Sequence, residues 1–459
     1  MIINLINNDF RFDISNIVLL FFPRIDTNDA TDGKTLTVSL NESYANATLL
    51  DNNKVFNHKV EMDSSLYEFE RYACDRAVFE VCFADTGLRP PWGLLVGVRP
   101  INFYTKLKSI YGNKTNEILE KYYLVSPDKI KLCSDILSIR QPYLNKLKQN
   151  SFSLYVSIPF CPSRCKYCSF VSFSTEKETK YIDKYVDILC EEIQKASVHL
   201  RGQSPLTIYI GGGTPSCIPD YLFENVVKCI TNSYDLSECF EFTVEAGRPE
   251  TVTENKLQIM KRYGVNRICI NPQSLSEIVL NFAGRKHSID DFFNAYALAS
   301  DYEFDINVDL IAGLPFETKE SFIDGLLKII RLSPSNITIH SLYIKRAADY
   351  GADASIYSNT NPEVVYEMLH SAYKILELSD YFPYYLYRQK NTIGNHENIG
   401  FAKKNKACAY NIYMMDELQT IYGCGANAMT KLVEDGHITR SCGTKYAYNY
   451  INKNGEKNK

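Results

Sequence analysis

The chain has 459 residues, a formal net charge of −4 and a hydrophobic content of 45%. This length exceeds the usual size of one domain, so we expect two or three folded units and a large core. The small net charge gives no reason to expect a nucleic-acid-binding surface or an acidic solvating tail.

The amino-terminal residues carry no targeting or membrane signal. Residues 1–13 contain no basic run ahead of an apolar stretch, and the apolar residues 17–22 are too few to cross a bilayer. We therefore expect a soluble, cytosolic protein. Fourteen cysteines in a long intracellular chain favour thiols and metal ligands over disulfides.

Residues 1–150 have the pattern of a separate α+β unit. Apolar residues alternate between Lys34 and Val60, and Asp51-Asn52-Asn53 divides them into two strands of a hairpin. Apolar residues then recur at spacings of three and four, which is typical of amphipathic helices. The helices predicted in this way cover residues 66–83, 116–123 and 128–147.

From Leu154 onward, short β-rich runs alternate with amphipathic helices, which is typical of parallel βα units in α/β proteins. The predicted strands cover residues 154–160, 206–211, 240–245, 267–271, 305–311 and 336–344, and two of the helices cover 178–196 and 319–332. Six units suit a partial barrel better than a closed eight-stranded one. We therefore predict a partial (β/α)6 barrel over residues 151–390, followed by a small C-terminal extension, residues 391–459, with a disordered polar tail.

Three cysteines follow the first predicted barrel strand. Cys161, Cys165 and Cys168 form a C-x3-C-x2-C run. Thiolates are soft ligands that suit iron–sulfur clusters or zinc, and three of them from one loop hold three corners of a cubane cluster and leave the fourth iron open. Structural zinc normally needs four protein ligands, and no second cysteine pair stands nearby, so we favour the cluster.

This cysteine run, placed after the first strand of a partial barrel, resembles the signature of radical S-adenosylmethionine (SAM) enzymes. The resemblance implies a [4Fe-4S] cluster whose open iron binds the amino and carboxylate groups of SAM. An electron from the cluster then cleaves SAM to a 5′-deoxyadenosyl radical. Tyr167 matches the aromatic position that packs on the adenine in this family.

A glycine motif, Gly211-Gly212-Gly213-Thr214-Pro215, ends the second predicted barrel strand. Glycines at this place let the backbone approach a ligand closely, although a tight strand-to-helix turn accounts for the same residues. After the cysteine run, the motif resembles the family segment that contacts the methionine part of SAM.

Polar residues also stand at the ends of later predicted strands. Glu245, Gln273 and Asp309 should converge with the cysteine loop, because sites form at the C-terminal edge of a parallel barrel. Arg285 would join them from a connecting loop. Each of these residues alone is more often a helix cap or a loop residue, but together they indicate a site.

The finer resemblance, over about residues 155–428, is to oxygen-independent coproporphyrinogen III oxidases, especially the long variant with an extra N-terminal domain. It implies oxidative decarboxylation of two propionates of this tetrapyrrole to vinyl groups, with a flavodoxin or ferredoxin as electron donor. One SAM molecule is implied, or two, since Gly213 and Thr214 match contacts of a second one. The residues that match the SAM pocket of this family are Tyr155, Tyr167, Gly212, Gly213, Thr214, Glu245, Gln273, Arg285 and Asp309.

Two departures from the family pattern bear on the substrate. Phe170 stands where the typical oxidase has a fourth cysteine, as in the long variant and the related haem carriers. The chain also stops at Lys459, so we expect a cover over the porphyrin to be missing or replaced by the N-terminal unit. Two rival functions on the same fold therefore stay open: a haem-trafficking protein, and a radical SAM enzyme that opens the haem ring.

Tyrosines and basic residues late in the chain have two interpretations each. Many of the 33 tyrosines follow Tyr343, and they either line a pocket for a planar ligand or serve in ordinary core and surface packing, which we favour. Arg346, Arg388 and Lys390 have the charge to bind propionates. Solvated surface bases are an equally good explanation for them.

Overall fold

The computed structural model describes residues 1–22, 33–170, 173–343, 348–352, 361–389, 396–434 and 437–455. Within it the chain divides into two compact units, Met1–Asp135 and Ile136–Lys459. The division of the chain predicted above, with boundaries at residues 150 and 390, stays a prediction.

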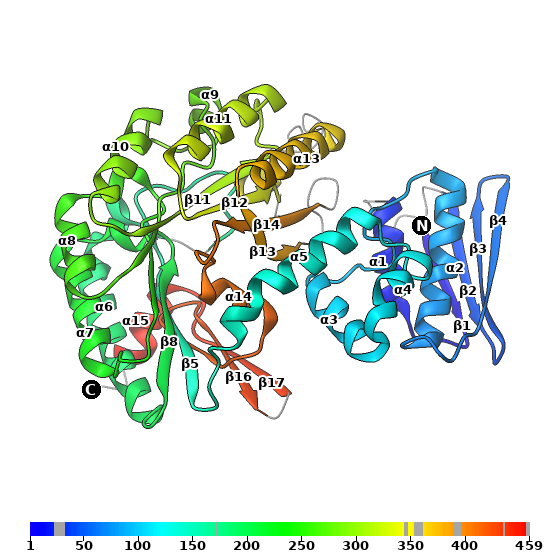
Figure 1. The fold of residues 1–459 in the computed structure, drawn as a ribbon, viewed down its shortest axis with the longest axis horizontal. Coiled ribbons are helices and arrows are strands. Elements are labelled where there is room, and N and C mark those ends of the chain that lie inside the picture. The colour runs from blue at the N-terminus through cyan, green and yellow to red at the C-terminus, as the bar shows by residue number, and fades with distance from the viewer. Residues whose placement is uncertain are drawn as a thin grey trace. The chain divides into compact units, whose positions relative to one another are not determined.

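The first unit contains a four-stranded sheet with helices on one face (Figure 1). Its strands, in sheet order, are β1 (Ile2–Ile6), β2 (Lys34–Leu40), β3 (Tyr44–Asp51) and β4 (Lys54–Glu61). The predicted hairpin is confirmed: β3 and β4 pair antiparallel, and Asn52 supplies the turn with a φ of 53°. The alternating Ala45, Ala47 and Leu49 are fully buried, because they face the helices.

Helices of the first unit follow the apolar spacing of the sequence. The helices predicted over residues 66–83, 116–123 and 128–147 are confirmed within a few residues at either end. Sequence reasoning missed β1, α1 and α3. The helices are α1 (Arg11–Phe21), α2 (Phe69–Thr86), α3 (Pro100–Tyr111), α4 (Thr115–Lys121) and the first part of α5 (Pro127–Leu144), which continues into the second unit.

The second unit is built on one 11-stranded sheet, with the order β13-β14-β12-β11-β10-β9-β8-β5-β15-β16-β17. Six neighbouring strands of this sheet run parallel and occupy the six predicted segments. Over the described ranges the order is linear from β13 to β17, so the predicted partial (β/α)6 barrel is confirmed. The six strands are β5 (Ser151–Ile158), β8 (Ser204–Gly212), β9 (Glu241–Glu245), β10 (Arg267–Cys269), β11 (Asp305–Ala312) and β12 (Asn336–Ser341).

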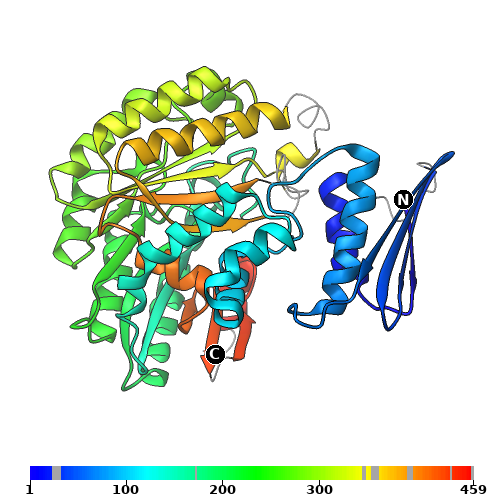
Figure 2. The same cartoon turned by 45° about the vertical axis from the view of Figure 1, so that its right-hand side comes forward.

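The barrel strands are buried on both faces, as parallel strands covered by helices must be. Leu154, Val156 and Ile158 of β5, for example, are fully buried. The helices lie outside the strands (Figures 1 and 2). They are α6 (Thr175–His199), α7 (Asp220–Ser233), α8 (Glu254–Arg262), α9 (Glu277–Phe282), α10 (Ile289–Ser300), α11 (Lys319–Leu332) and α13 (Pro362–Leu378).

The segment after α13 adds strands to both ends of the parallel part. β14 (Glu397–Ala402) pairs antiparallel with β12 and with β13 (Phe382–Arg388). β15 (Ile421–Cys424) pairs in parallel with β5, and β16 (Met429–Glu434) and β17 (His437–Cys442) follow antiparallel. The helices of this segment are α14 (Ala409–Asp416) and α15 (Ala447–Gly455).

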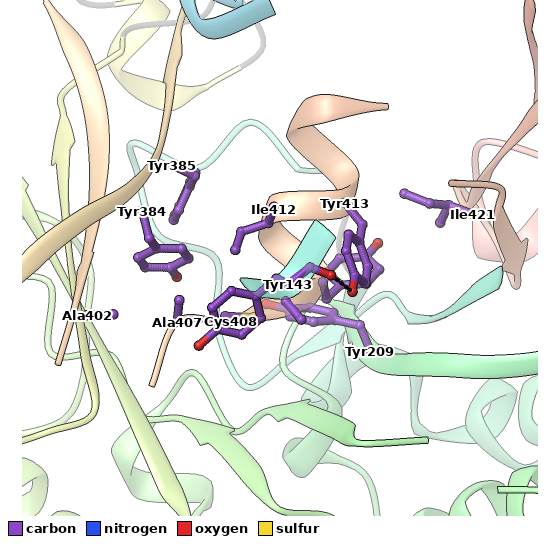
Figure 3. Close-up of a cluster of buried hydrophobic side chains, with 12 residues drawn as sticks. Tyr143, Tyr209, Tyr384, Tyr385, Ala402, Ala407, Cys408, Ile412, Tyr413 and Ile421 are labelled. Atoms are coloured by element: carbon purple, nitrogen blue, oxygen red, sulfur yellow. Dashed lines mark hydrogen bonds between the residues drawn. The ribbon is translucent and has the colours of Figure 1, made fainter. Parts of the chain in front are cut away.

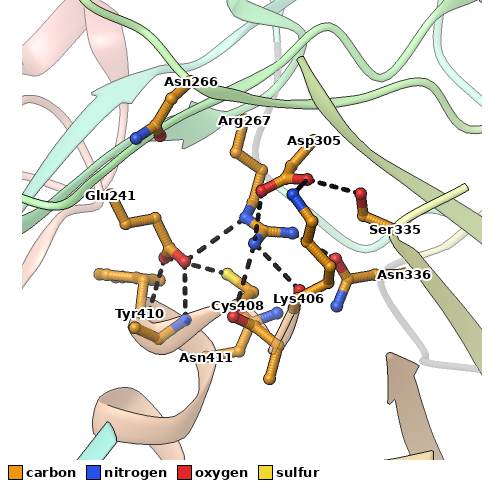
Figure 4. Close-up of polar contacts among 12 residues, drawn as sticks. Glu241, Asn266, Arg267, Asp305, Ser335, Asn336, Lys406, Cys408, Tyr410 and Asn411 are labelled. Carbon is orange, nitrogen blue, oxygen red and sulfur yellow. Dashed lines mark hydrogen bonds and ion pairs between the residues drawn. The ribbon is translucent and has the colours of Figure 1, made fainter. Parts of the chain in front are cut away.

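A buried ion pair fixes α14 beneath the N-terminal ends of the barrel strands. Arg267, the first residue of β10, pairs with Glu241, the first residue of β9, at 3.4 Å (Figure 4). The Glu241 carboxylate accepts hydrogen bonds from the backbone N–H groups of Ala409 and Tyr410 at 2.8 and 2.9 Å. The first turn of α14, where backbone N–H groups lack helical partners, is thus capped by a carboxylate from the barrel.

Several of the tyrosines late in the chain belong to the core. Aromatic rings from β8, β13 and α14 pack together in the interior (Figure 3). Tyr410 of α14 stacks on Tyr209 of β8 with ring centroids 4.4 Å apart. The buried tyrosines of this cluster are Tyr143, Tyr209, Tyr384, Tyr385, Tyr410 and Tyr413.

Candidate active site

The three cysteines follow β5: Cys161 ends the short strand β6 (Phe160–Cys161), and Cys165 and Cys168 lie in the loop after it. Cys168 donates a backbone hydrogen bond to the carbonyl of Cys165 at 3.0 Å, so these two residues share one tight turn. The backbone N–H of Lys166 donates to the carbonyl of Ala283 at 3.0 Å, which holds this turn against the end of α9. Burial and the nearby Cys165 and Cys161 thiols raise the pKa of Cys168 to about 11.

The donor chemistry of this loop fits an iron–sulfur cluster. Among the described residues, no three His, Cys, Asp or Glu side chains are grouped to hold a single metal ion. A single ion needs its ligands around one point, whereas each cysteine of a cubane cluster binds a different iron. Cys161, Cys165 and Cys168 would hold three of these irons, and this assignment is a proposal.

The glycine turn at the end of β8 packs directly on the cysteine loop. Gly212 has a φ of 111°, which glycine adopts without strain. A Cβ on Gly213 would lie 2.4 Å from the carbonyl oxygen of Phe160, so only glycine fits there. The hydroxyl of Thr214 donates to Sγ of Cys161 at 3.5 Å. The motif therefore serves packing as well as the site.

Glu245, at the end of β9, lies beside this turn. Its Oε1 accepts a hydrogen bond of 2.5 Å from the hydroxyl of Tyr209. Burial raises the pKa of Glu245 to about 7, opposed by the hydrogen bond from Tyr209 and aided by the charge of Asp309. Near neutral pH this carboxyl therefore gains or loses its proton readily, and a cationic ligand would favour the ionised form. The ring of Tyr155 stacks beside Tyr209, 6.3 Å away.

Arg285 joins the cysteine loop from the other side. Its Nη1 donates to the hydroxyl of Tyr167 at 3.1 Å, and its Nη2 donates to the carbonyl oxygens of Asn271 and Gly247 at 2.5 and 3.3 Å. The side chain is buried, so these bonds fix the guanidinium. Burial, and next the Cys165 thiol, raise the pKa of Tyr167 above its usual range, so the phenol keeps its proton.

Gln273 and Asp309 form the remaining part of the predicted site. The Gln273 backbone donates to the carbonyl of Asp309 at 3.1 Å, and its buried side-chain Oε1 has no hydrogen-bond partner among the described residues. Such an orphaned acceptor suits a ligand that donates a hydrogen bond. Oδ2 of Asp309 accepts from Nδ2 of Asn271 at 2.9 Å and lies 3.6 Å from Nε2 of His340. The Tyr387 hydroxyl meets Nδ1 of the same His340 at 3.2 Å.

Sequence reasoning missed Tyr209, Asn271, His340 and Arg248, which contact the predicted residues. Arg248 donates from Nη1 to Sγ of Cys165 at 3.2 Å. The signal for it was its position in Glu245-Ala-Gly-Arg-Pro, three residues after a predicted site residue. His340 lies near the end of β12, as Asp309 lies near the end of β11, and the same strand-end argument applies to it.

Of the three basic residues suggested for propionate binding, the structure describes Arg388. Arg388 on β13 is buried opposite Glu397 of β14, and burial lowers its pKa to about 10, so it remains charged at neutral pH. A role for Arg388 in substrate binding stays a prediction. Arg346 and Lys390 lie outside the described residues.

In the part of the chain that the structure describes, no helix combines the length and the apolar character that a bilayer span requires.

Comparison with known proteins agrees with this fold. Residues 155–328 match the model of the Radical SAM superfamily. The solved structure of coproporphyrinogen III oxidase (HemN) from Escherichia coli, a radical SAM enzyme, aligns with a TM-score of 0.55 at 20% identity, covering 69% of this chain and 71% of that one. The fold is therefore that of the radical SAM class, whose members use a [4Fe-4S] cluster and SAM.

Two curated relatives indicate the family within the radical SAM class. The oxygen-independent coproporphyrinogen-III oxidase-like protein HemZ of Bacillus subtilis is 36% identical over 80% of this chain and 75% of its own length. The heme chaperone HemW of Escherichia coli is 28% identical over 66% of this chain and 77% of its own. The chain belongs to the oxygen-independent coproporphyrinogen III oxidase-like family of radical SAM proteins.

Proposed function

We propose that the protein is a radical SAM oxidoreductase that converts two propionate side chains of coproporphyrinogen III to vinyl groups with loss of CO2. The main support is that the cysteine loop is joined to both halves of the expected SAM pocket. Thr214 contacts Cys161 on one side, and Arg285 binds Tyr167 on the other. The 36% identity to the HemZ oxidase-like protein supports the reaction type.

In this proposal, each group of residues has a task in binding. Cys161, Cys165 and Cys168 hold the cluster, and when bound, the cluster and SAM supply the radical that removes hydrogen from the substrate. Tyr167, fixed by Arg285, packs on the adenine. Glu245 offers a carboxylate to the nucleotide. The residues that complete the pocket are Tyr155, Gly212, Gly213, Thr214, Gln273 and Asp309.

Three stacked tyrosines below the pocket, Tyr155, Tyr209 and Tyr410, would keep water away from the reaction. Tyr155 and Tyr410 both lie against Tyr209, with ring centroids 6.3 and 4.4 Å from it. Their stacked rings lie between Glu245 and α14 and would limit the access of solvent on that side. Exclusion of water protects a reactive radical from side reactions. A flavodoxin or ferredoxin as electron donor and a cytosolic location are part of this proposal.

The second candidate function is haem transfer, which the identity to the heme chaperone HemW favours. Anaerobic incubation of the reconstituted protein with SAM, a low-potential reductant and coproporphyrinogen III separates the two. The oxidase proposal expects release of CO2 and a product with vinyl groups. Tight haem binding without turnover would instead support a carrier. A cleaved tetrapyrrole, found by product mass when haem is the substrate, would support ring opening.

A further inference from the structure

We propose that Arg248 is a positioning residue that raises the reduction potential of the cluster by donating a hydrogen bond to Cys165. The inference rests on the proposed binding of the cluster by Cys161, Cys165 and Cys168. It assigns a role to a residue that the family resemblance leaves without one.

Arg248 reaches the cysteine loop with both ends of its guanidinium fork. Nη1 lies 3.2 Å from Sγ of Cys165, and Nη2 donates to the hydroxyl of Ser163 at 3.1 Å. The residue is only 3% exposed, so water does not compete for these bonds. Two bonds from one planar group to one loop fix both the loop and the charge beside it.

Glu250 holds the Arg248 guanidinium in place. Nε of Arg248 donates to Oε1 of Glu250 at 2.8 Å, and Nη2 lies 2.6 Å from the same oxygen. The carbonyl oxygen of Arg248 accepts from the hydroxyl of Thr251 at 2.8 Å. The short 3₁₀ helix Pro249–Thr251 therefore presents the guanidinium to the loop in one orientation, with Glu250 as its counter-charge.

The position of this cation bears on the electron that enters the cluster. A one-electron carrier gives one electron to the cluster, which becomes more negative by one charge. A guanidinium is always protonated, and a hydrogen bond to a ligand sulfur stabilises that added charge. Because the site is buried, the effect is weakly screened. Arg248 should therefore make the cluster easier to reduce.

A redox titration of the reconstituted full chain tests this inference without SAM or substrate. The electron paramagnetic resonance signal of the reduced cluster is followed against a series of ambient potentials. The variants are Arg248→Gln, which keeps a donor but loses the charge, and Glu250→Gln, which removes the counter-charge. The control is Arg262→Gln, because Arg262 lies on α8 with a side chain that is 61% exposed and pairs with Glu224.

We expect opposite shifts from the two variants. At a fixed ambient potential, Arg248→Gln should lower the ratio of reduced to oxidised cluster about tenfold, which is about 59 mV for a one-electron couple. Glu250→Gln should raise that ratio, and Arg262→Gln should leave it unchanged.

Unchanged potentials in Arg248→Gln and Glu250→Gln, with full iron content, would overturn the inference and leave the proposed function standing. If Arg248→Gln holds no cluster, Glu250→Gln decides alone, because its potential must still rise. Unaltered protein that assembles no cluster would overturn the inference together with the proposed function.

Discussion

The hydroxyl of Tyr209 donates a hydrogen bond of 2.5 Å to the carboxylate of Glu245. Tyr209 also stacks on Tyr410 of α14, so a helix from the C-terminal segment helps to orient a residue of the expected SAM pocket. This relationship makes the ionisation of Glu245 sensitive to a residue outside the pocket, and it can be tested by titration.

Tyr209→Phe should weaken SAM binding and move its pH dependence upward. The bond from Tyr209 lowers the pKa of Glu245, which burial raises to about 7, so removing the bond should raise this pKa further. The carboxylate favours a cationic ligand, so SAM affinity should increase as the pH rises through about 7 in the unaltered protein and at higher pH in the variant. Equilibrium dialysis at several pH values measures this. The control is Tyr413→Phe, which loses a hydrogen bond to the Tyr143 carbonyl in the same cluster. Equal pH midpoints of SAM binding in Tyr209→Phe and the unaltered protein would contradict the prediction.

Cys165→Ala should abolish cluster assembly and SAM cleavage while the fold persists, because the loop lies at the barrel mouth. Iron and sulfide content, 5′-deoxyadenosine formation and circular dichroism measure the three effects. Cys190→Ala on α6 is the matched control and should keep its cluster. Retained SAM cleavage in Cys165→Ala would disprove the assignment of this ligand.

Gly213→Ala should displace the cysteine loop. The added Cβ would lie 2.4 Å from the carbonyl oxygen of Phe160, so the strand end must move. Overpacking of this kind costs about 1–3 kcal/mol of folding free energy, and iron content should fall with it. Gly247→Ala is the control, because its Cβ would meet only Nδ2 of Asn271 at 3.8 Å. Equal urea midpoints and equal iron content in the two variants would refute the steric argument.

Arg267→Met should destabilise the second unit strongly. The substitution leaves the buried Glu241 carboxylate without its cation, and removing one partner of a buried ion pair costs about 3–5 kcal/mol. Glu241 also holds the start of α14, so the loss should reach the C-terminal segment. Urea unfolding measures the change. Arg262→Met on the surface should stay within about 0.5 kcal/mol of the unaltered protein, and a similar small effect in Arg267→Met would argue against the role of this pair.

Much of the barrel could be predicted because parallel strands are marked by continuous apolar runs between amphipathic helices. Residues 305–311 and 319–332 illustrate this, since β11 and α11 cover them completely. β15 was missed because it is a four-residue strand whose partner, β5, precedes it by more than 260 residues. Local patterns carry no information about such distant pairing.

The candidate site could likewise be predicted only in part. Glu245 and Asp309 could be predicted because strand ends converge, whereas the contact between Arg248 and Cys165 depends on how a side chain turns back toward a loop 83 residues earlier. The tyrosines show the reverse problem, since aromatic residues suit a ligand pocket and a core equally well. Only the packing of Tyr384 and Tyr413 in three dimensions separates these two interpretations.

The central claim is that three cysteines leave one iron of the cluster free to bind SAM. Electron paramagnetic resonance of the reduced, reconstituted protein, recorded with and without SAM, tests it most directly. We predict that SAM changes the g-values of the cluster signal, because its amino and carboxylate groups bind the open iron. An identical signal with SAM present at saturating concentration would contradict the claim.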